Sequence, residues 1–183
     1  MSKVGLIIGS SRPGRIGAQV TEWVQSKLPV VVGVSYELID LAEWDMPMFD
    51  EVMSPTMGQY NNAHTKKWAA HIADLQGFVI VTPEYNAGYP AVLKNAIDYL
   101  KAEWKDKPTL VVSYGWDGGL SANNQLREVL ARVGNKLVEA HPALKFTGPD
   151  MFGEDGKVKD VEATFGSKAD EVTQAGQQLV DLL

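Results

Sequence analysis

The sequence predicts an α/β protein in which one parallel β-sheet lies between two layers of helices. Three apolar runs, each followed by a loop rich in glycine, proline or aromatic residues, are typical of strands covered on both faces. Segments with apolar residues at helical spacing separate these runs. Strands and helices alternate along the 183 residues, and such alternation favours parallel strands joined by right-handed crossovers.

Five segments have the composition of strands, and the third of them is an uninterrupted apolar run. They are residues 4–8, 34–40, 78–82, 109–113 and 136–139. Each pair of successive strand-like runs has room for one helix between them. The length of the chain fits a single domain, residues 1–183, with one sizeable core.

Five helices are expected between and after these strands. Their apolar faces are Val20, Trp23, Val24 and Leu28; Trp68, Ile72 and Leu75; Leu93, Ala96, Ile97 and Leu100; Leu126, Val129, Leu130 and Val133; and Val172, Leu179, Val180 and Leu183. Asn61 or Asn62 is expected to cap the second helix and Gly77 to end it, while Pro90 stands where the third begins. This order of elements predicts a flavodoxin-like three-layer sandwich with strand order 2-1-3-4-5.

Composition and charge exclude several classes of function. The net charge of −6 argues against non-specific nucleic-acid binding, which needs a basic surface. The chain has no cysteine, which excludes thiol catalysis, disulfides and cysteine-ligated metal clusters. No apolar stretch approaches the roughly 20 residues of a membrane helix. We therefore expect a cytoplasmic protein that binds neither nucleic acid nor membrane.

A loop rich in small residues, Gly9 to Gly17, follows the first strand. In an open α/β sheet the ligand binds beyond the carboxyl ends of the strands at the switch point, here between strands 1 and 3. Small residues let the backbone approach an anion, and Arg12 and Arg15 offer planar forks for phosphate. The loop predicts a phosphate cradle, and the alternative is a glycine-rich turn with solvated arginines.

Two known nucleotide-binding patterns fit this loop incompletely. The Walker pattern requires Gly-Lys-Ser/Thr, but Arg15 and Ile16 follow Gly14, so nucleotide triphosphate chemistry is not expected. The dinucleotide pattern requires a second glycine where Ser11 stands. Asp40 lies near the place of a ribose-binding acid, and the alternative for Asp40 is a cap at the end of a strand.

Two further loops at the predicted switch point contain aromatic and polar residues. They are residues 82–90 after strand 3 and residues 113–119 after strand 4. A flat heterocycle needs backbone polar groups along its edge and apolar surface on its faces, and both loops supply them. Their alternatives are tight turns with surface tyrosines and, for Trp116, a place in a subunit interface. The irregular segment 42–61, which contains four methionines, is a second interface candidate.

The three loops together resemble the NADPH-dependent FMN reductase family, which includes flavodoxin-like quinone, azo and chromate reductases. The resemblance rests on Gly9-Ser10-Ser11-Arg12 through Gly17, on Pro83-Glu84-Tyr85-Asn86, and on Ser113-Tyr114-Gly115 with Gly118-Gly119. It extends from the first strand to the helix after the fourth. In many relatives the first loop ends in Ser/Phe/Asn-type residues, where this chain has Arg15-Ile16-Gly17.

The resemblance implies FMN as cofactor and NADPH or NADH as co-substrate. Ser10, Arg12 and Gly17 would hold the FMN phosphate, with Arg15 as an addition. The residues that would surround the isoalloxazine are Pro83, Glu84, Tyr85 and Asn86 on one side and Ser113, Tyr114 and Gly115 on the other. Family members are typically homodimers or homotetramers in which a neighbouring subunit borders the flavin.

The function that this resemblance implies is ping-pong transfer of hydride from NAD(P)H via FMN to a small-molecule acceptor such as a flavin, quinone, azo compound or chromate. Because the cofactor carries the chemistry, no catalytic side chain and no metal are expected. A flavodoxin-type electron carrier or flavin-sensing protein is the first alternative, and it would not oxidise NADPH by itself. An NAD-binding Rossmann dehydrogenase is the second; it would purify colourless, and Asp40→Ala would weaken its NAD binding.

Overall fold

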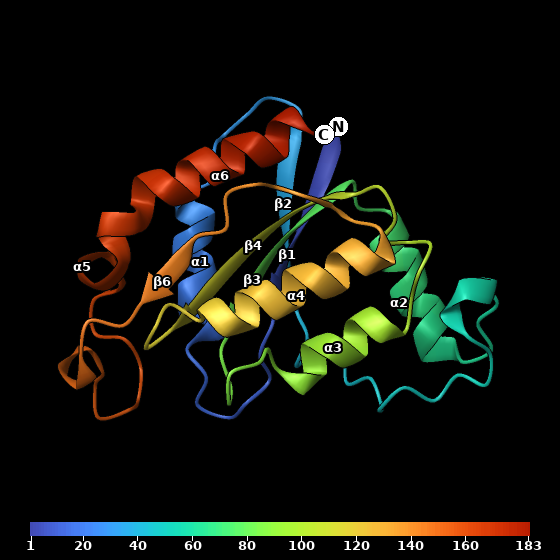
Figure 1. The fold of residues 1–183 in the computed structure, drawn as a ribbon, viewed down its shortest axis with the longest axis horizontal. Helices are drawn as coiled ribbons and strands as arrows, with labels where there is room; N and C mark the ends of the chain where they lie inside the picture. Colours follow the sequence, from blue (N-terminus) through green and yellow to red (C-terminus); the bar gives the residue numbers. More distant parts are fainter.

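The structure, a computed structural model, describes residues 1–183 and contains one parallel sheet between two helical layers (Figure 1). The strands are β1 (Ser2–Ile8), β2 (Val34–Asp40), β3 (Gly77–Pro83), β4 (Pro108–Gly115), β5 (Lys136–Leu137) and β6 (Ala143–Lys145). The α-helices are α1 (Gly17–Lys27), α2 (Ala63–Ala73), α3 (Ala91–Asp98), α4 (Leu120–Val133), α5 (Val161–Phe165) and α6 (Ala169–Asp181).

The sheet has the predicted strand order β2-β1-β3-β4-β5, and every pairing in it is parallel. The flavodoxin-like fold is therefore confirmed. In β3 and β4 every residue is buried, because helices cover both faces of the central strands. A strand covered on both faces is expected to be apolar at every position, whereas a strand covered on one face alternates apolar and polar residues.

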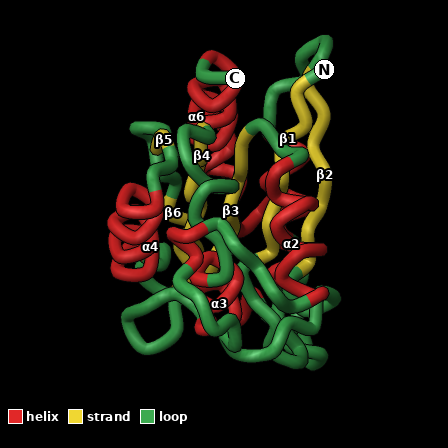
Figure 2. Tube along the Cα trace, turned by 90° about the vertical axis from the view of Figure 1, so that its right-hand side faces the viewer, coloured by secondary structure: helices red, strands yellow, loops and turns green.

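Alternate residues of the central strands point into two separate cores. On one face, Val79 and Val81 of β3 pack with α1 and α6. On the other face, Phe78 and Ile80 pack with α2, α3 and α4. The two views of the chain show these layers on either side of the sheet, and both termini lie at the end where the strands begin (Figure 2). The opposite end, where the strands finish, is therefore left to the loops.

The fifth strand position differs from the prediction of one strand over residues 136–139. Two short strands occupy it: β5 pairs with the beginning of β4 and β6 with its end. Between them the Ser113 N–H donates to the Pro142 carbonyl at 3.1 Å, so the edge follows β4 without forming a continuous ladder. Pro142, directly before β6, has no N–H to donate to a ladder.

Two helix boundaries also correct the sequence-based expectations. Helix α2 follows Asn62 as its N-cap residue, as expected, but it ends at Ala73, and Gly77 is the first residue of β3 rather than the end of the helix. Helix α5 lies in the polar segment before α6, where no helix was expected. The Asp160 carboxylate caps α5 by accepting from the Ala163 N–H at 2.8 Å, a contact that stabilises so short a helix.

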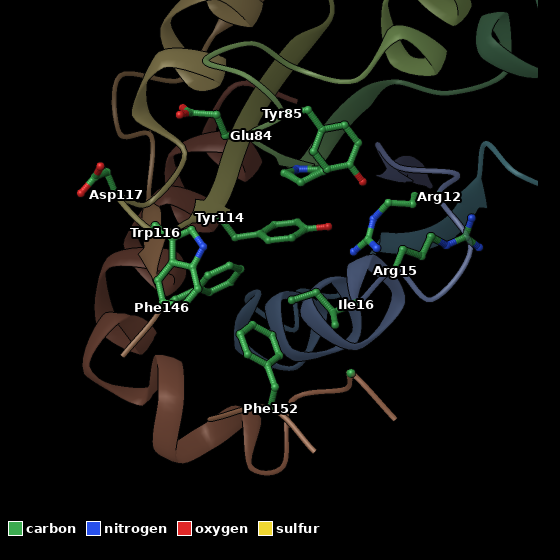
Figure 3. A pocket seen from close by; sticks show the side chains of 13 residues that line it. Arg12, Arg15, Ile16, Glu84, Tyr85, Tyr114, Trp116, Asp117, Phe146 and Phe152 are labelled. Carbon is green, nitrogen blue, oxygen red and sulfur yellow. The ribbon is translucent and has the colours of Figure 1, made fainter. Parts of the chain in front are cut away.

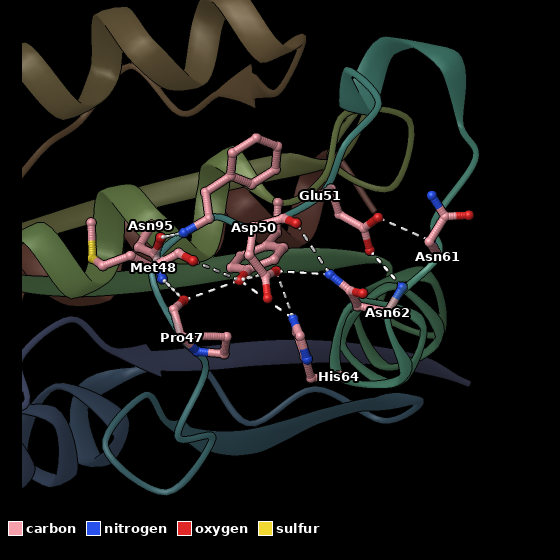
Figure 4. Close-up of polar contacts among 10 residues, drawn as sticks. Pro47, Met48, Asp50, Glu51, Asn61, Asn62, His64 and Asn95 are labelled. Atoms are coloured by element: carbon pink, nitrogen blue, oxygen red, sulfur yellow. Dashed lines mark hydrogen bonds and ion pairs between the residues drawn. The ribbon is translucent and has the colours of Figure 1, made fainter.

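The long segment between β2 and α2 is tied to the molecule by a polar network around Asp50 (Figure 4). One Asp50 carboxylate oxygen receives the Tyr99 hydroxyl at 3.0 Å and the Asn62 amide at 2.9 Å, and lies 2.9 Å from the His64 Nε2. Glu51 accepts the backbone N–H groups that precede α2. The segment is thus fixed to α2 and α3 by its own acidic residues.

Among the helices of the structure, none combines the length and the apolar character that crossing a lipid bilayer requires.

Candidate functional site

A cavity of about 230 Å³ opens where β1, β3 and β4 end (Figure 3). Its lining comes from four loops that are far apart in the sequence. The residues are Arg12, Arg15, Ile16, Pro83, Glu84, Tyr85, Tyr114, Gly115, Trp116, Asp117, Phe146, Phe152 and Gly156. The position agrees with the switch point that the strand order predicts.

The loop after β1, the candidate anion cradle, lies at one end of this site. Ser10 is fully buried, and its hydroxyl has no hydrogen-bond partner. The backbone N–H groups of residues 10–12, 14 and 16–19 donate no backbone hydrogen bond, and the last of them form the first turn of α1. A buried hydroxyl without a partner beside unpaired N–H groups is an arrangement that an anion satisfies.

Gly17 is required by the close approach of this loop to its neighbours. A β-carbon at residue 17 would lie 2.4 Å from the Ser10 hydroxyl oxygen and 3.2 Å from the Tyr114 hydroxyl. No larger residue fits without displacing the groups that face the cradle. The sequence-based interest in Gly17 therefore has a steric reason, although Gly17 and Ser10 do not themselves line the cavity.

The two arginines of the loop have different surroundings. Arg15 pairs with the Asp40 carboxylate and donates to the Ser10 carbonyl at 3.0 Å. Asp40 also accepts from the Ala42 N–H at 3.0 Å, so it acts as the strand-end cap that was the alternative to a ribose-binding acid. Arg12 is exposed and forms no ion pair. Its guanidinium is thus the one of the two that is available to a ligand.

The loop after β3 turns tightly between Tyr85 and Gly88. Each of these residues donates its N–H to the carbonyl of the other, at 2.8 Å and 3.0 Å. Asn86 and Ala87 both have positive φ, 49° and 61°, which is the conformation of a type I′ turn. Alanine rarely adopts it, and such strain is often found at ligand sites. The turn places the Tyr85 ring on the cavity, while Asn86 lies outside it.

The loop after β4 is shaped by glycines and by Ser113. The buried Ser113 hydroxyl donates to the Gly118 carbonyl at 2.7 Å and receives the Asn123 amide at 3.0 Å. Gly118 and Gly119 have φ values of 74° and 73°, which favour glycine. Ser113 therefore holds the loop in shape, whereas Tyr114 and Gly115 reach the cavity.

An aromatic wall, which we define as Trp116, Phe146 and Phe152, closes the other end of the cavity (Figure 3). Phe146 meets both other rings edge-on, with centroids 5.3 Å from Trp116 and 5.4 Å from Phe152. Trp116 remains 56% exposed, so its ring is open to a partner. Tyr114 lies across the cavity between this wall and Arg12.

The cavity brings together many of the residues predicted from the sequence and adds others that the sequence did not indicate. Seven predicted residues line the cavity: Arg12, Arg15, Pro83, Glu84, Tyr85, Tyr114 and Gly115. Ser10, Gly17, Asn86 and Ser113 support the loops from outside the lining. Phe146 and Phe152 were missed because they lie beyond the recognised loops, where the sequence is polar and irregular. The only signal was two aromatic residues near glycines.

Burial controls the ionisation of the central tyrosine. Tyr114 is 3% exposed, and this burial raises the pKa of its hydroxyl above the usual value of 10.0. The hydroxyl therefore remains protonated near neutral pH and acts as a neutral hydrogen-bond donor. The Glu84 carboxylate accepts from the Ala122 N–H at the start of α4, at 3.1 Å, so it anchors a helix rather than facing a ligand as a free base.

The comparisons with known proteins agree with the fold and identify the family. Residues 2–146 match the family described as NADPH-dependent FMN reductase. An NAD(P)H-dependent FMN reductase of Schizosaccharomyces pombe is 42% identical over 144 residues, 78% of this chain and 72% of the relative. An NAD(P)H-dependent FMN reductase of a Nectria species is 37% identical over 199 aligned residues, covering 100% of this chain and 98% of the relative.

Solved structures show the same architecture. The flavoenzyme NAD(P)H:(acceptor) oxidoreductase FerB of Paracoccus denitrificans superposes with a TM-score of 0.73 and 22% identity, over 99% of this chain and 98% of that one. At this level of identity the likeness shows the fold. The sequence match, which covers the loops after β1, β3 and β4, shows more: this chain belongs to the NADPH-dependent FMN reductase family.

Proposed function

We propose that this protein is an FMN-dependent NAD(P)H oxidoreductase whose acceptor is a flat aromatic molecule of the quinone class. The observation that carries the proposal is one cavity with an anion cradle at one end and the aromatic wall at the other. A phosphate on a planar heterocycle matches the first end. A second planar molecule matches the aromatic wall at the other end, where the Trp116 ring is exposed.

The residues present fit FMN. The unpaired Ser10 hydroxyl, the free N–H groups before α1 and the unpaired Arg12 suit its phosphate. Pro83, Tyr85 and the backbone around Gly115 suit its ring. When bound, FMN supplies hydride chemistry that no side chain of this site provides.

The protein's own contribution is binding and orientation. Of the carboxylates in the lining, Glu84 anchors α4, and Asp117 is exposed with Lys145 3.6 Å away. Neither faces a histidine or a second acid within the lining, so no acid–base pair is assembled there. Tyr114, held neutral by burial, offers a hydrogen bond near the cradle. We therefore assign no side chain as catalytic acid, base or nucleophile.

The aromatic wall favours a planar aromatic acceptor such as a quinone over an oxyanion such as chromate. Ring faces and edges attract a planar aromatic molecule through burial and quadrupole contacts. An oxyanion such as chromate gains nothing from such a surface.

A homo-oligomer is part of the proposal. Five large apolar side chains of the segment between β2 and α2 are exposed: Met48, Phe49, Val52, Met53 and Met57. A cluster of exposed apolar side chains on one segment favours contact between copies of the chain. Size-exclusion chromatography with light scattering tests this, and a monomer at every concentration would contradict it.

The first experiment is an absorbance spectrum of the purified protein before and after anaerobic addition of NADPH, followed by a quinone. We expect flavin bands that bleach with NADPH and return with the quinone, and parallel lines in double-reciprocal plots. Bands that persist with NADPH and NADH would indicate an electron carrier or sensor. A colourless protein that takes up no added FMN would refute the proposal.

A further inference from the structure

A short hairpin contributes to the site from beyond the residues that match the family, which end at residue 146. We call residues 152–158 the clasp hairpin. Phe152 and Val158 form an antiparallel bridge, and the Gly153 N–H donates to the Lys157 carbonyl at 2.8 Å. The Asp155 carboxylate accepts the Lys157 N–H at 3.0 Å. These contacts give the hairpin a defined shape.

The clasp hairpin grips the loop that forms the anion cradle. The Lys157 ammonium donates to the Arg15 carbonyl at 2.6 Å. Val158 exchanges two hydrogen bonds with the Gln19 amide on α1, each 3.1 Å long. The three contacts join segments about 140 residues apart in the sequence, and they hold both the loop and the first turn of α1.

The Lys157 contact orients a peptide group of the cradle. The peptide bond between Arg15 and Ile16 is trans, as all peptide bonds of the chain are. In a trans peptide the C=O and N–H groups point in opposite directions. Because Lys157 holds the Arg15 carbonyl, the Ile16 N–H is directed away from the hairpin. That N–H donates no backbone hydrogen bond, and Ile16 lines the cavity.

Lys157 also adds positive charge where it is needed. Arg15 is neutralised by Asp40, and only Arg12 among the cradle's own residues carries an unpaired charge. Lys157 is half-buried and forms no ion pair with a carboxylate. A phosphate at the cradle carries up to two negative charges. The hairpin therefore supplies, at the Arg15 carbonyl, a second cation without an ion-pair partner.

We infer that Lys157 is a positioning residue for the FMN phosphate: it fixes the Ile16 N–H toward the phosphate and adds charge to the cradle from the clasp hairpin. The inference rests on the proposed function, because it takes FMN as the ligand. The inference assigns part of the phosphate site to the C-terminal part of the chain, beyond the loops that the family shares.

The test compares FMN with riboflavin, which lacks the phosphate. Apoprotein is titrated with each flavin, and quenching of flavin fluorescence gives the two dissociation constants. The variants are Lys157→Met, Lys157→Arg and, as a matched control, Lys159→Met. Lys159 carries the same charge two residues away, but its ammonium donates to the Asp150 carbonyl at 3.0 Å. The thermal midpoint of each apoprotein checks folding.

We expect Lys157→Met to weaken FMN binding by about tenfold, because the Ile16 N–H loses its fixed orientation toward the phosphate and the cradle loses a nearby positive charge, and to leave riboflavin binding unchanged. Lys157→Arg should restore most of the FMN affinity, and Lys159→Met should match the wild type. Inorganic phosphate should raise the thermal midpoint of wild-type apoprotein more than that of Lys157→Met.

Two results would overturn the inference. Equal losses of FMN and riboflavin affinity in Lys157→Met, or unchanged FMN affinity, would show that Lys157 does not act on the phosphate. If Lys157→Met does not fold, Gln19→Leu, which removes the bonds to Val158, must show the same selective loss for FMN. A wild-type protein that binds neither flavin would instead refute the proposed function.

Discussion

The Ser10 hydroxyl oxygen lies 2.4 Å from the position that a β-carbon on residue 17 would occupy. The hydroxyl is buried and has no partner in the protein, and the short distance leaves no room for a side chain at residue 17. Ser10 and Gly17 therefore affect the site through their close packing, and neither of them lines the cavity.

The variant Gly17→Ala should therefore lose both stability and flavin binding. The added methyl group would displace Ser10 or Tyr114, and overpacking of this kind costs about 1–3 kcal/mol. For a chain of this size the thermal midpoint should fall by about 2–4 °C per kcal/mol, and the FMN dissociation constant should rise. Gly148→Ala is the control, because a β-carbon there meets nothing within 4 Å. Equal effects of the two variants would contradict the steric role.

The variant Arg12→Ala should weaken FMN binding without unfolding the protein. Arg12 is exposed and unpaired, so its removal costs the fold little, whereas the phosphate loses a charge-assisted contact of about tenfold in affinity. Titration of the apoprotein with FMN at low and high salt measures this, and the salt dependence should be smaller in the variant. Unchanged FMN affinity would remove Arg12 from the phosphate site.

The variant Arg15→Met should act mainly on stability. It leaves the Asp40 carboxylate, which is only 14% exposed, without its ion-pair partner, at a cost on the order of 2 kcal/mol. Urea denaturation of the apoprotein measures the loss. Asp40→Asn in the same background should recover part of it, because the unpaired charge is removed. A double variant no more stable than Arg15→Met would show that the pair contributes little.

The variants Trp116→Ala and Phe152→Ala should lower kcat/KM for a quinone while the rate with ferricyanide remains unchanged. Ferricyanide takes electrons without stacking on a ring, so its rate does not depend on the wall. A quinone loses aromatic contacts and buried area in these variants, and its kcat/KM should fall by about tenfold. Steady-state assays with both acceptors at saturating NADPH distinguish a loss of quinone contacts from a general loss of electron transfer. Equal losses with both acceptors would place the aromatic wall at the flavin rather than at the acceptor.

The Asp50 network should make stability sensitive to acid. The hydrogen bond with His64, followed by those of Tyr99 and Asn62, holds the pKa of the Asp50 carboxyl below its ordinary value of 3.8. A lowered pKa in the folded state stabilises the fold above the unfolded-state value, and that stability is lost as the pH falls through the folded-state value. Below about pH 4 the thermal midpoint should therefore drop.

The comparison variant for this pH dependence is Asp50→Asn, which should show a shallower drop of the thermal midpoint in the same acidic range. Asp45→Asn, an exposed position of the same segment, should keep the wild-type profile. If Asp50→Asn and the wild type lose stability in parallel, other carboxylates cause the acid sensitivity.

The central strands could be predicted from the sequence because the apolar residues that indicate their burial are neighbours in the sequence. Every residue of 78–82 is apolar or β-branched, and no other element type suits so short a run between turn residues. The edge of the sheet could not be predicted in the same way. Whether residues 136–145 form one strand or two depends on Pro142 and on contacts with β4, which are long-range.

The site shows the same division between local and long-range information. Arg12, Tyr85 and Tyr114 were found because they lie in loops directly after strands, where parallel topology brings a ligand. Lys157 contacts residue 15, about 140 positions earlier, and Phe152 belongs to a wall assembled from two loops. No pattern within residues 147–158 indicates these partners, because only the folded chain brings them together.

The clasp hairpin joins the two ends of the cavity in one rigid piece. Phe152 stands at one end of the bridge that shapes it, and Val158, at the other end, is bonded to α1. Coupling between two ligands is reciprocal. If a molecule stacked on Phe152 favours the hairpin position that holds Arg15, it must tighten the binding of FMN, and loss of FMN must weaken the binding of that molecule by the same factor.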